Sequence, residues 1–199
     1  EGFRDVIEMR TESRFDQYDL NLTLPTPLVP REDRFAVAGR IGAQGQELAP
    51  LDEDALHALA ERIASGGYGA VAIGFIHSYL NPSHETRARQ IIAARCDLPI
   101  SISSDVSPQM REFERFNTVC ANAYVRPQMA SYLERLQTRL KDRGATCPVF
   151  MIHSGGGLVS VETAAEFPVR LVESGPAGGA IFAADVARRF GLNKVVSYD

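Results

Sequence analysis

The chain has 199 residues, 45% of them hydrophobic and 23% charged, which is typical of a globular protein with one substantial core or two small ones. Its net charge of -4 at pH 7 offers no basic surface to a phosphate backbone, so we expect no nucleic-acid partner. The three cysteines (Cys96, Cys120 and Cys147) include no C-x-x-C pair and indicate neither a disulfide framework nor a zinc knuckle.

No apolar run approaches the roughly 20 residues that a membrane-spanning helix needs. Residues 1–5 do not resemble a signal sequence, so we expect a cytoplasmic protein that does not bind membranes. The chain opens without a methionine, and residues 194–199 have the pattern of a hydrophobic strand that stops at an acidic residue. We therefore expect it to be part of a longer polypeptide.

The first half of the chain predicts strands that alternate with helices. In chain order we expect an extended lead-in over 1–33, a strand over 35–41, a turn over 42–45, a helix over 52–65, a strand over 70–76, a helix over 81–95 and a strand over 98–102. The run over 70–76 is almost entirely apolar, as expected of a parallel strand covered on both faces. The order strand, helix, strand predicts a right-handed parallel crossover.

The second half predicts two successive long helices. The first begins at Ser107 and is interrupted by Pro127; the second runs to Gly144. We assign the apolar face of the first helix to Met110, Phe113, Cys120 and Tyr124. The remaining expected elements are a buried strand over 148–152, a short helix after Ser160, an extended piece over 169–172, a helix over 176–190 and a strand over 194–199. Together the elements predict an α/β fold with parallel and mixed sheet and covering helices.

A strand that runs into three glycines is the strongest indication of a binding site. Ser154, Gly155, Gly156 and Gly157 follow the strand expected over 148–152. Glycines let backbone N–H groups approach an anion closely, and a following helix would add its positive end. We therefore assign these four residues to a phosphate-binding site. A tight turn without a ligand is the alternative.

Two further segments point to the same ligand. The helix over 176–190 starts with small residues, and we assign Ser174, Gly175, Gly178 and Gly179 to the nucleotide side, with close packing of the helix as the alternative. Asp199 would stand at the carboxyl end of a strand, where open α/β sheets bind ligands. There it could hold Mg²⁺ through water, although it could also be only a turn residue.

Other polar residues carry less weight. His57, His77 and His84 do not pair with cysteine or carboxylate at metal-ligand spacing, whereas His153 lies beside the glycine loop. The charged segment 111–115 could reach a substrate, but we expect solvated ion pairs across a helix face. No G-x-S-x-G motif is present, so a conventional serine hydrolase lacks support.

Eight segments, in order along the chain, resemble the family that contains ATP-dependent N-methylhydantoinase, 5-oxoprolinase and acetone carboxylase subunits. They are Gly2-Phe3-Arg4-Asp5-Val6-Ile7-Glu8, Pro27-Leu28-Val29-Pro30-Arg31, Phe75-Ile76-His77-Ser78-Tyr79-Leu80-Asn81-Pro82, Ser104-Asp105-Val106-Ser107-Pro108 with Glu112-Phe113-Glu114-Arg115, Asn122-Ala123-Tyr124, Ser154-Gly155-Gly156-Gly157, Ser174-Gly175-Pro176-Ala177-Gly178 and Val196-Ser197-Tyr198-Asp199. The likeness spans essentially the whole chain.

The resemblance implies part of an actin-like, ribonuclease-H-like ATPase fold that binds ATP and Mg²⁺. Residues 1–103 would belong to the family's N-terminal region, and residues 104–199 would begin its core domain and stop at the second phosphate loop. The first phosphate loop would precede Glu1. Because neither loop is complete, we expect no turnover from this chain alone.

The resemblance also implies the chemistry of the full-length protein. ATP would phosphorylate the carbonyl oxygen of a small cyclic amide, such as a hydantoin or 5-oxoproline, and water would then attack the activated carbon. A second hydantoinase B-type subunit or domain is the expected partner. The alternatives are an acetone or ketone carboxylase subunit and a non-catalytic, ATP-gated binding module. The chain departs from the family pattern at His153, Gly155 and Phe116-Asn117, which leaves the substrate open.

Overall fold

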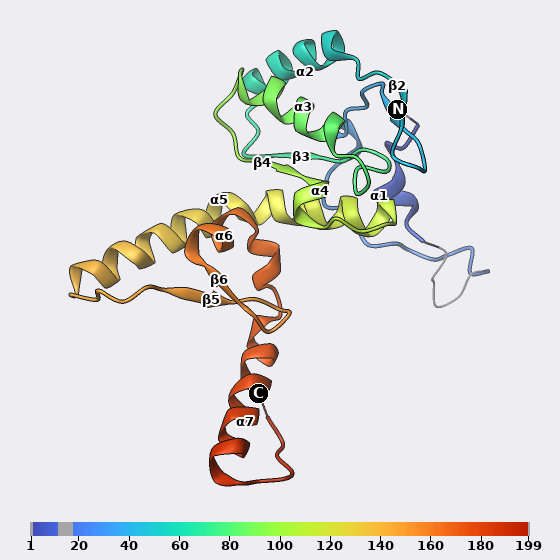
Figure 1. The fold of residues 1–199 in the computed structure, drawn as a ribbon. Coiled ribbons are helices and arrows are strands. Elements are labelled where there is room, and N and C mark those ends of the chain that lie inside the picture. Colours follow the sequence, from blue (N-terminus) through green and yellow to red (C-terminus); the bar gives the residue numbers. More distant parts are fainter. Residues whose placement is uncertain (1, 12–17, 199) are drawn as a thin grey trace. The chain divides into compact units, whose positions relative to one another are not determined.

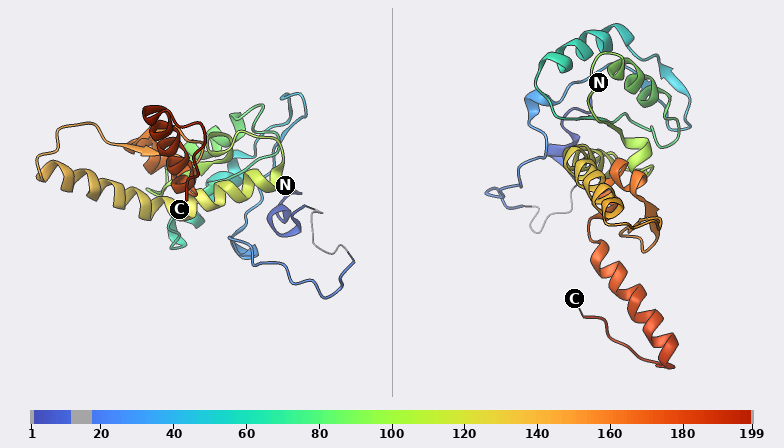
Figure 2. Two further views of the ribbon diagram at one scale, coloured as in Figure 1. Left: turned by 90° about the horizontal axis from the view of Figure 1, so that it is seen from below. Right: turned by 90° about the vertical axis from the view of Figure 1, so that its left-hand side faces the viewer.

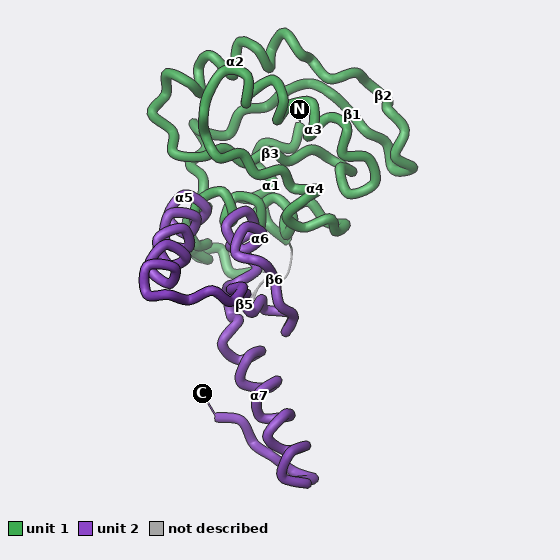
Figure 3. The backbone as a smooth tube through the Cα atoms, turned by 60° about the vertical axis from the view of Figure 1, so that its left-hand side comes forward, with its two compact units in different colours: residues 1–124 green, residues 125–199 purple. Residues whose placement is uncertain are grey.

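The structure, a computed structural model, describes residues 2–11 and 18–198. These residues form two compact units, residues 1–124 and residues 125–199, which are coloured separately in Figure 3. Each unit has its own cluster of buried hydrophobic side chains. Parallel and antiparallel strand pairs occur together with covering helices, so the predicted α/β class with parallel and mixed sheet is confirmed.

The first unit alternates helices and strands (Figure 1). In chain order it contains α1 (Val6–Met9), the 3₁₀ helix η1 (Arg31–Asp33), β1 (Arg40–Ile41), β2 (Glu47–Ala49), α2 (Glu53–Ser65), β3 (Val71–Ile73), α3 (Ser83–Ala93), β4 (Ile100–Ile102), α4 (Ser103–Val106) and the first part of α5 (Glu112–Asp142). The predicted strand over 35–41 is reduced to β1, which pairs with β2 in antiparallel fashion around the expected turn. The lead-in over 1–33 is not wholly extended, because it holds α1 and η1.

The parallel pair β3–β4 organises the core of the first unit. Helices α2 and α3 pack on one face of this pair, as the views in Figures 1 and 2 show. Ile100 and Ile102 of β4 point into that core, whereas Ser101 between them hydrogen-bonds to Asn122 of α5. This is the alternation expected of a strand covered on both faces. The predicted parallel pairing of these two strands is therefore confirmed.

Helix α5 corrects two predictions. It is one helix rather than two, with Pro127 inside it. Proline removes only the N–H that would bond to the carbonyl of Ala123, and the helix continues because Leu133 beyond it is fully buried in the core of the second unit. The helix starts at Glu112 rather than at Ser107, since Arg111 has a φ of 83°, which a right-handed helix does not accept.

The second unit (Figure 3) pairs a hairpin with short helices. It contains the rest of α5, β5 (Phe150–Ile152), β6 (Leu158–Ser160), α6 (Val161–Glu166), the 3₁₀ helix η2 (Pro168–Leu171) and α7 (Ser174–Phe190). Helix α6 begins where predicted, because the Ser160 side chain accepts a hydrogen bond from Thr163 N at 3.2 Å.

Three expectations for the second unit are wrong. β5 is not a buried strand: Phe150 is 53% exposed and Ile152 38% exposed. The segment over 169–172 lies largely in the 3₁₀ helix η2, which Pro168 starts with a φ suited to a helical turn. Residues 194–198 form no strand, because no other strand of the described chain pairs with them.

Candidate functional site: a glycine hairpin beside the start of α7

The three glycines form the turn of the β5–β6 hairpin. His153 N donates to Gly157 O at 3.0 Å, and Gly156 N donates to His153 O at 2.8 Å. Gly156 has a φ of +81°, a conformation that glycine adopts without strain. The loop leads into β6, and α6 begins only at Val161. The helix predicted after Ser160 is therefore present, but β6 separates it from the glycines.

The imidazole of His153 folds over its own loop. Gly155 N donates to His153 Nδ1 at 3.0 Å. A Cβ atom added to Gly155 would lie 2.7 Å from His153 Cε1, and one added to Gly157 would lie 2.5 Å from Nε2. A side chain at either glycine would therefore meet this ring in its present position. Ser154 N is also engaged, because it donates to Arg170 O at 2.8 Å.

Helix α7 begins with small residues, as predicted. Glu173 precedes it in the left-handed conformation, with φ 59° and ψ 29°. Within the described chain no side chain caps this end, so the first-turn amides of Ser174 and Gly175 are not occupied by a side-chain cap. Such amides, together with the helix dipole, attract anions.

The hairpin loop and the start of α7 lie against each other. A Cβ atom on Gly178 would lie 3.3 Å from Ile152 Cδ1, and one on Gly156 would lie 3.3 Å from Ile181 Cδ1. Gly179 faces Ser197 Oγ at the same distance. The structure therefore brings together the two predicted glycine segments. Their glycines serve close packing, and the same juxtaposition would place two sets of amides near one ligand. The nucleotide assignment of both segments stays a prediction.

The predicted magnesium residue, Asp199, lies outside the described residues. Tyr198 before it is 98% exposed. Among residues 2–11 and 18–198, no three His, Cys, Asp or Glu side chains gather in a way that could hold a metal ion. The Mg²⁺ assignment therefore stays a prediction.

A buried polar network in the first unit escaped the sequence analysis. Glu85 of α3 is fully buried, and its carboxylate accepts hydrogen bonds from Phe75 N at 2.8 Å, Ser104 N at 2.8 Å and Ser103 Oγ at 2.6 Å. These donors follow the carboxyl ends of β3 and β4, where parallel sheets commonly place functional groups. The three hydrogen bonds stabilise the buried carboxylate of Glu85.

Arg115 completes this network from α5. Its guanidinium donates to Ser103 Oγ at 3.1 Å, to Gln109 O at 2.9 Å and to Phe75 O at 2.9 Å. It is fully buried, and burial lowers the pKa of the guanidinium below its ordinary value, with the Glu85 charge opposing the shift. Solvated ion pairing was the wrong expectation for Arg115. The network was detectable in principle, because Arg115, Val119, Asn122 and Ala123 recur at helical spacing and form the buried face of α5.

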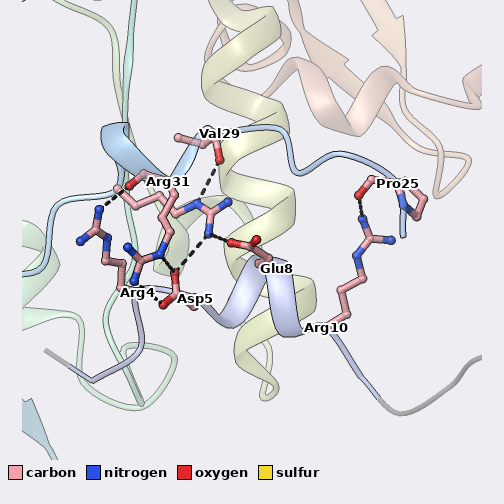
Figure 4. A network of polar contacts seen from close by, with 8 residues as sticks. Arg4, Asp5, Glu8, Arg10, Pro25, Val29 and Arg31 are labelled. Carbon is pink, nitrogen blue, oxygen red and sulfur yellow. Dashed lines mark hydrogen bonds and ion pairs between the residues drawn. The ribbon is translucent and has the colours of Figure 1, made fainter. Parts of the chain in front are cut away.

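The N-terminal segment is tied to the following loop by ionic contacts, drawn in Figure 4. Asp5 accepts two hydrogen bonds from Arg31, at 3.0 and 3.1 Å, and Arg34 bonds to Glu8 at 2.7 Å. The hydrogen bond from Arg31 lowers the pKa of Asp5. Two of the segments that carry the family resemblance, 2–8 and 27–31, therefore meet in space.

The histidines of the first unit make ordinary contacts. His77 Nδ1 lies 2.9 Å from Ile41 O, and His84 Nε2 lies 3.1 Å from Glu47 Oε1. The buried Nδ1 atom of His84 has no hydrogen-bond partner in the described structure.

No helix of the described chain is both long and apolar enough to cross a membrane.

The site thus consists of a glycine hairpin packed on a small-residue helix in an α/β chain. Comparison with known proteins identifies the family. The family profile described as Hydantoinase/oxoprolinase N-terminal region matches residues 1–96, and the profile described as Hydantoinase/oxoprolinase matches residues 115–199. The chain belongs to the hydantoinase/oxoprolinase family. The predicted domain boundary between residues 103 and 104 falls in the interval that neither profile covers and stays a prediction.

Three matches show which members of the family this chain is similar to. Caprolactamase subunit alpha of Pseudomonas jessenii is 37% identical over 202 aligned residues, covering 100% of this chain and 29% of the relative. The crystal structure of the ATP-dependent caprolactamase from that organism matches with a TM-score of 0.84 and 36% identity, covering 96% of this chain and 28% of the other. A nucleotide-free acetone carboxylase matches with a TM-score of 0.80 and 27% identity over 96% of this chain and 28% of the other. The chain thus spans less than a third of the length of these relatives.

Proposed function

We propose that the full-length protein containing this chain is an ATP-dependent amidohydrolase that opens a small cyclic amide. The observation that carries the proposal is the difference in similarity: 36% identity to the ATP-dependent caprolactamase structure against 27% to the acetone carboxylase structure, over the same 96% of the chain. A lactam is the substrate class of the more similar relative. Hydantoins and 5-oxoproline contain the same amide group and are the neighbouring candidates.

The reaction needs activation because resonance stabilises an amide. ATP supplies a phosphoryl group to the carbonyl oxygen, and this converts the oxygen into a leaving group. Water then adds to the carbon and the ring C–N bond breaks, which leaves an acyl phosphate on the ring-opened chain. A second water attacks the acyl carbon and releases phosphate, so the products are the amino acid, ADP and phosphate. Mg²⁺ would neutralise the phosphates. The actin-like ATPase core expected from the family resemblance would supply the nucleotide cleft.

The residues at the start of α7 fit a phosphate better than the hairpin loop does. Ser174 and Gly175 precede Pro176 at a helix end that no side chain caps within the described chain. In the loop, the N–H groups of Ser154, Gly155 and Gly156 already have acceptors. Turning the His153 ring away would free Gly155 N. We therefore propose that α7 provides the first phosphate contacts and that the loop contributes after His153 rotates.

The substrate test is ADP release by the full-length protein with its partner subunit. The panel contains caprolactam, hydantoin, 5-oxoproline, acetone with bicarbonate, and no addition. We expect a cyclic amide to accelerate ADP release at least about tenfold and to yield the ring-opened acid. Stimulation by acetone with bicarbonate alone would favour the carboxylase alternative. Equal rates with every addition would favour the ATP-gated binding module.

The isolated 199-residue chain provides a second test. We expect no turnover and weak or absent ATP binding, measured by calorimetry with Mg²⁺ present. Micromolar affinity would contradict the expectation that the phosphate-binding elements are incomplete in this chain.

A further inference from the structure

The side chain of His153 occupies one amide of the glycine loop. Gly155 N donates to His153 Nδ1 at 3.0 Å, so this ring nitrogen serves as the acceptor. The two neighbouring amides use backbone acceptors instead. Ser154 N donates to Arg170 O at 2.8 Å, and Gly156 N donates to His153 O at 2.8 Å. Of these three amides, the one at Gly155 is therefore the one whose partner is a side chain that can rotate.

The imidazole can leave this position without a change in the backbone of the hairpin. His153 N donates to Gly157 O at 3.0 Å, and Ile152 pairs with Leu158 in the β5–β6 ladder. These contacts involve backbone atoms alone. Rotation about the side-chain bonds of His153 breaks none of them, although it breaks the hydrogen bond from Gly155. The loop is thus a preformed turn with a donor that a side-chain movement can release.

The ring nitrogen stands where an anion would bind. Nδ1 of His153 lies 3.0 Å from Gly155 N, and a phosphate oxygen would accept from the same N–H at a similar distance. Two acceptor atoms cannot occupy that position together. A Cβ atom on Gly155 or Gly157 would lie within 2.7 Å of a ring atom, so the ring lies close against the loop. A phosphate and the imidazole therefore exclude each other at this amide.

We infer that His153 is an internal competitor of the nucleotide, which must displace the imidazole from Gly155 N before the loop binds a phosphate oxygen. The inference rests on the proposed function, because it takes the nucleotide as the ligand of this loop. His153 then weakens nucleotide binding, since only the molecules with a free amide bind with full affinity. A histidine that contacted the phosphate directly would strengthen binding. The two roles predict opposite effects of removing the ring.

A matched pair of variants in the full-length protein tests this role. His153→Ala frees the amide, whereas His153→Asn keeps an acceptor for it, because asparagine accepts from the N–H two residues ahead. We expect His153→Ala to bind the non-hydrolysable analogue AMP-PNP with Mg²⁺ about 3- to 10-fold more tightly, the ratio for one exchanged hydrogen bond. His153→Asn should bind it like the parent protein. Calorimetry measures all three proteins.

The outcomes of this titration separate the inference from the proposed function. Weaker or unchanged binding by His153→Ala would overturn the inference, and so would equal gains in both variants, because the amide would then not be the contested group. The proposed function would survive these results if the parent protein still opened a cyclic amide. Failure of the parent protein to bind AMP-PNP would contradict both.

Chemical labelling of the unaltered full-length protein tests the displacement without a substitution. Diethyl pyrocarbonate acylates imidazole nitrogens, and peptide mapping by mass spectrometry follows each histidine. AMP-PNP with Mg²⁺ should speed the reaction of His153 several-fold, because the bound phosphate turns the ring out of the loop. His57, exposed on α2, is the internal reference and should react at the same rate with and without nucleotide. Slower or unchanged labelling of His153 would overturn the inference.

Discussion

The hydroxyl of Ser103 lies between the carboxylate of Glu85 and the guanidinium of Arg115. It donates to Glu85 Oε1 at 2.6 Å and accepts from Arg115 Nε at 3.1 Å. One small side chain thus connects α3 and α5 just after the carboxyl end of β4. Because all three residues are fully buried, loss of this hydroxyl would leave Arg115 Nε without its acceptor and Glu85 with only its two backbone donors.

Ser103→Ala should destabilise the protein by about 1–3 kcal/mol, since the buried Arg115 Nε loses its acceptor and Glu85 Oε1 loses one of its two donors. Ser104→Ala is the matched control. The Ser104 hydroxyl is buried without a hydrogen-bond partner, and its backbone N–H still bonds to Glu85. Urea unfolding of both variants measures the difference. Equal destabilisation by the two substitutions would contradict the hydrogen-bond assignment.

Replacing the buried guanidinium of Arg115 should lower the free energy of unfolding more than Ser103→Ala does. Arg115→Met removes three buried hydrogen bonds and the positive charge near Glu85, so we expect a loss of about 3–5 kcal/mol. Arg111→Met, four residues earlier and exposed, should have little effect. Chemical unfolding measures both. If Arg115→Met were as stable as the parent chain, the network would not stabilise the fold.

The contact of His153 with its own loop predicts a rescue. Gly157→Ala should destabilise the hairpin by about 1–3 kcal/mol, because the new methyl group would meet the imidazole. His153→Ala in the same chain should recover most of this loss. Gly156→Ala should not be rescued, since its positive φ strains any side chain. A double-mutant cycle without coupling between positions 153 and 157 would be inconsistent with this geometry.

The ionic contact of Asp5 has a defined pH dependence. The pKa of Asp5 is lowered in the folded chain, first by its hydrogen bond from Arg31. The contribution of this contact to the free energy of unfolding is therefore present above the ordinary carboxyl pKa. It is lost as pH falls through the lowered pKa of Asp5. Titration of the Asp5 carboxyl carbon by NMR should show the low midpoint, and Arg31→Met should raise it. An unchanged midpoint in that variant would exclude Arg31 as the cause.

The thiols should differ in reactivity. Burial raises the pKa of Cys120 to about 11, whereas Cys147 is exposed. Since the thiolate is the reactive form, iodoacetamide at pH 8 should modify Cys147 first and leave Cys120 largely unmodified. Peptide mapping by mass spectrometry follows both sites. Faster labelling of Cys120 would show that this side of α5 is open to solvent.

The elements that follow simple local rules could be predicted from sequence. Asp52 caps α2, Ser160 caps α6, and the apolar residues of β3 and β4 specify a parallel pair. The start of α7 was located to within two residues, and the glycine turn was also located, because small residues and glycines leave a local signature.

The predictions that the structure contradicts share one cause, which is contact between residues far apart in the sequence. The apolar face of this helix was assigned to Met110, Phe113, Cys120 and Tyr124. Phe113 and Cys120 are partly buried, whereas Met110 and Tyr124 are 67% and 78% exposed. The buried face of α5 contains Arg115 and Asn122, polar residues that hydrogen-bond to Ser103 at the start of α4 and to Ser101 of β4. Periodicity of hydrophobic residues cannot detect such partners. The same holds for residues 194–198, whose strand pattern has no pairing strand in the described chain.

The most direct test of the proposed chemistry follows the oxygen atom of the amide. The full-length protein and its partner subunit are supplied with ATP and with a cyclic amide labelled with ¹⁸O at the carbonyl. If the carbonyl oxygen is phosphorylated, the label should appear in the released inorganic phosphate, with one ¹⁸O transferred per ring opened. Unlabelled phosphate, with all ¹⁸O retained in the ring-opened acid, would contradict phosphorylation of the carbonyl oxygen followed by attack of water at the acyl carbon.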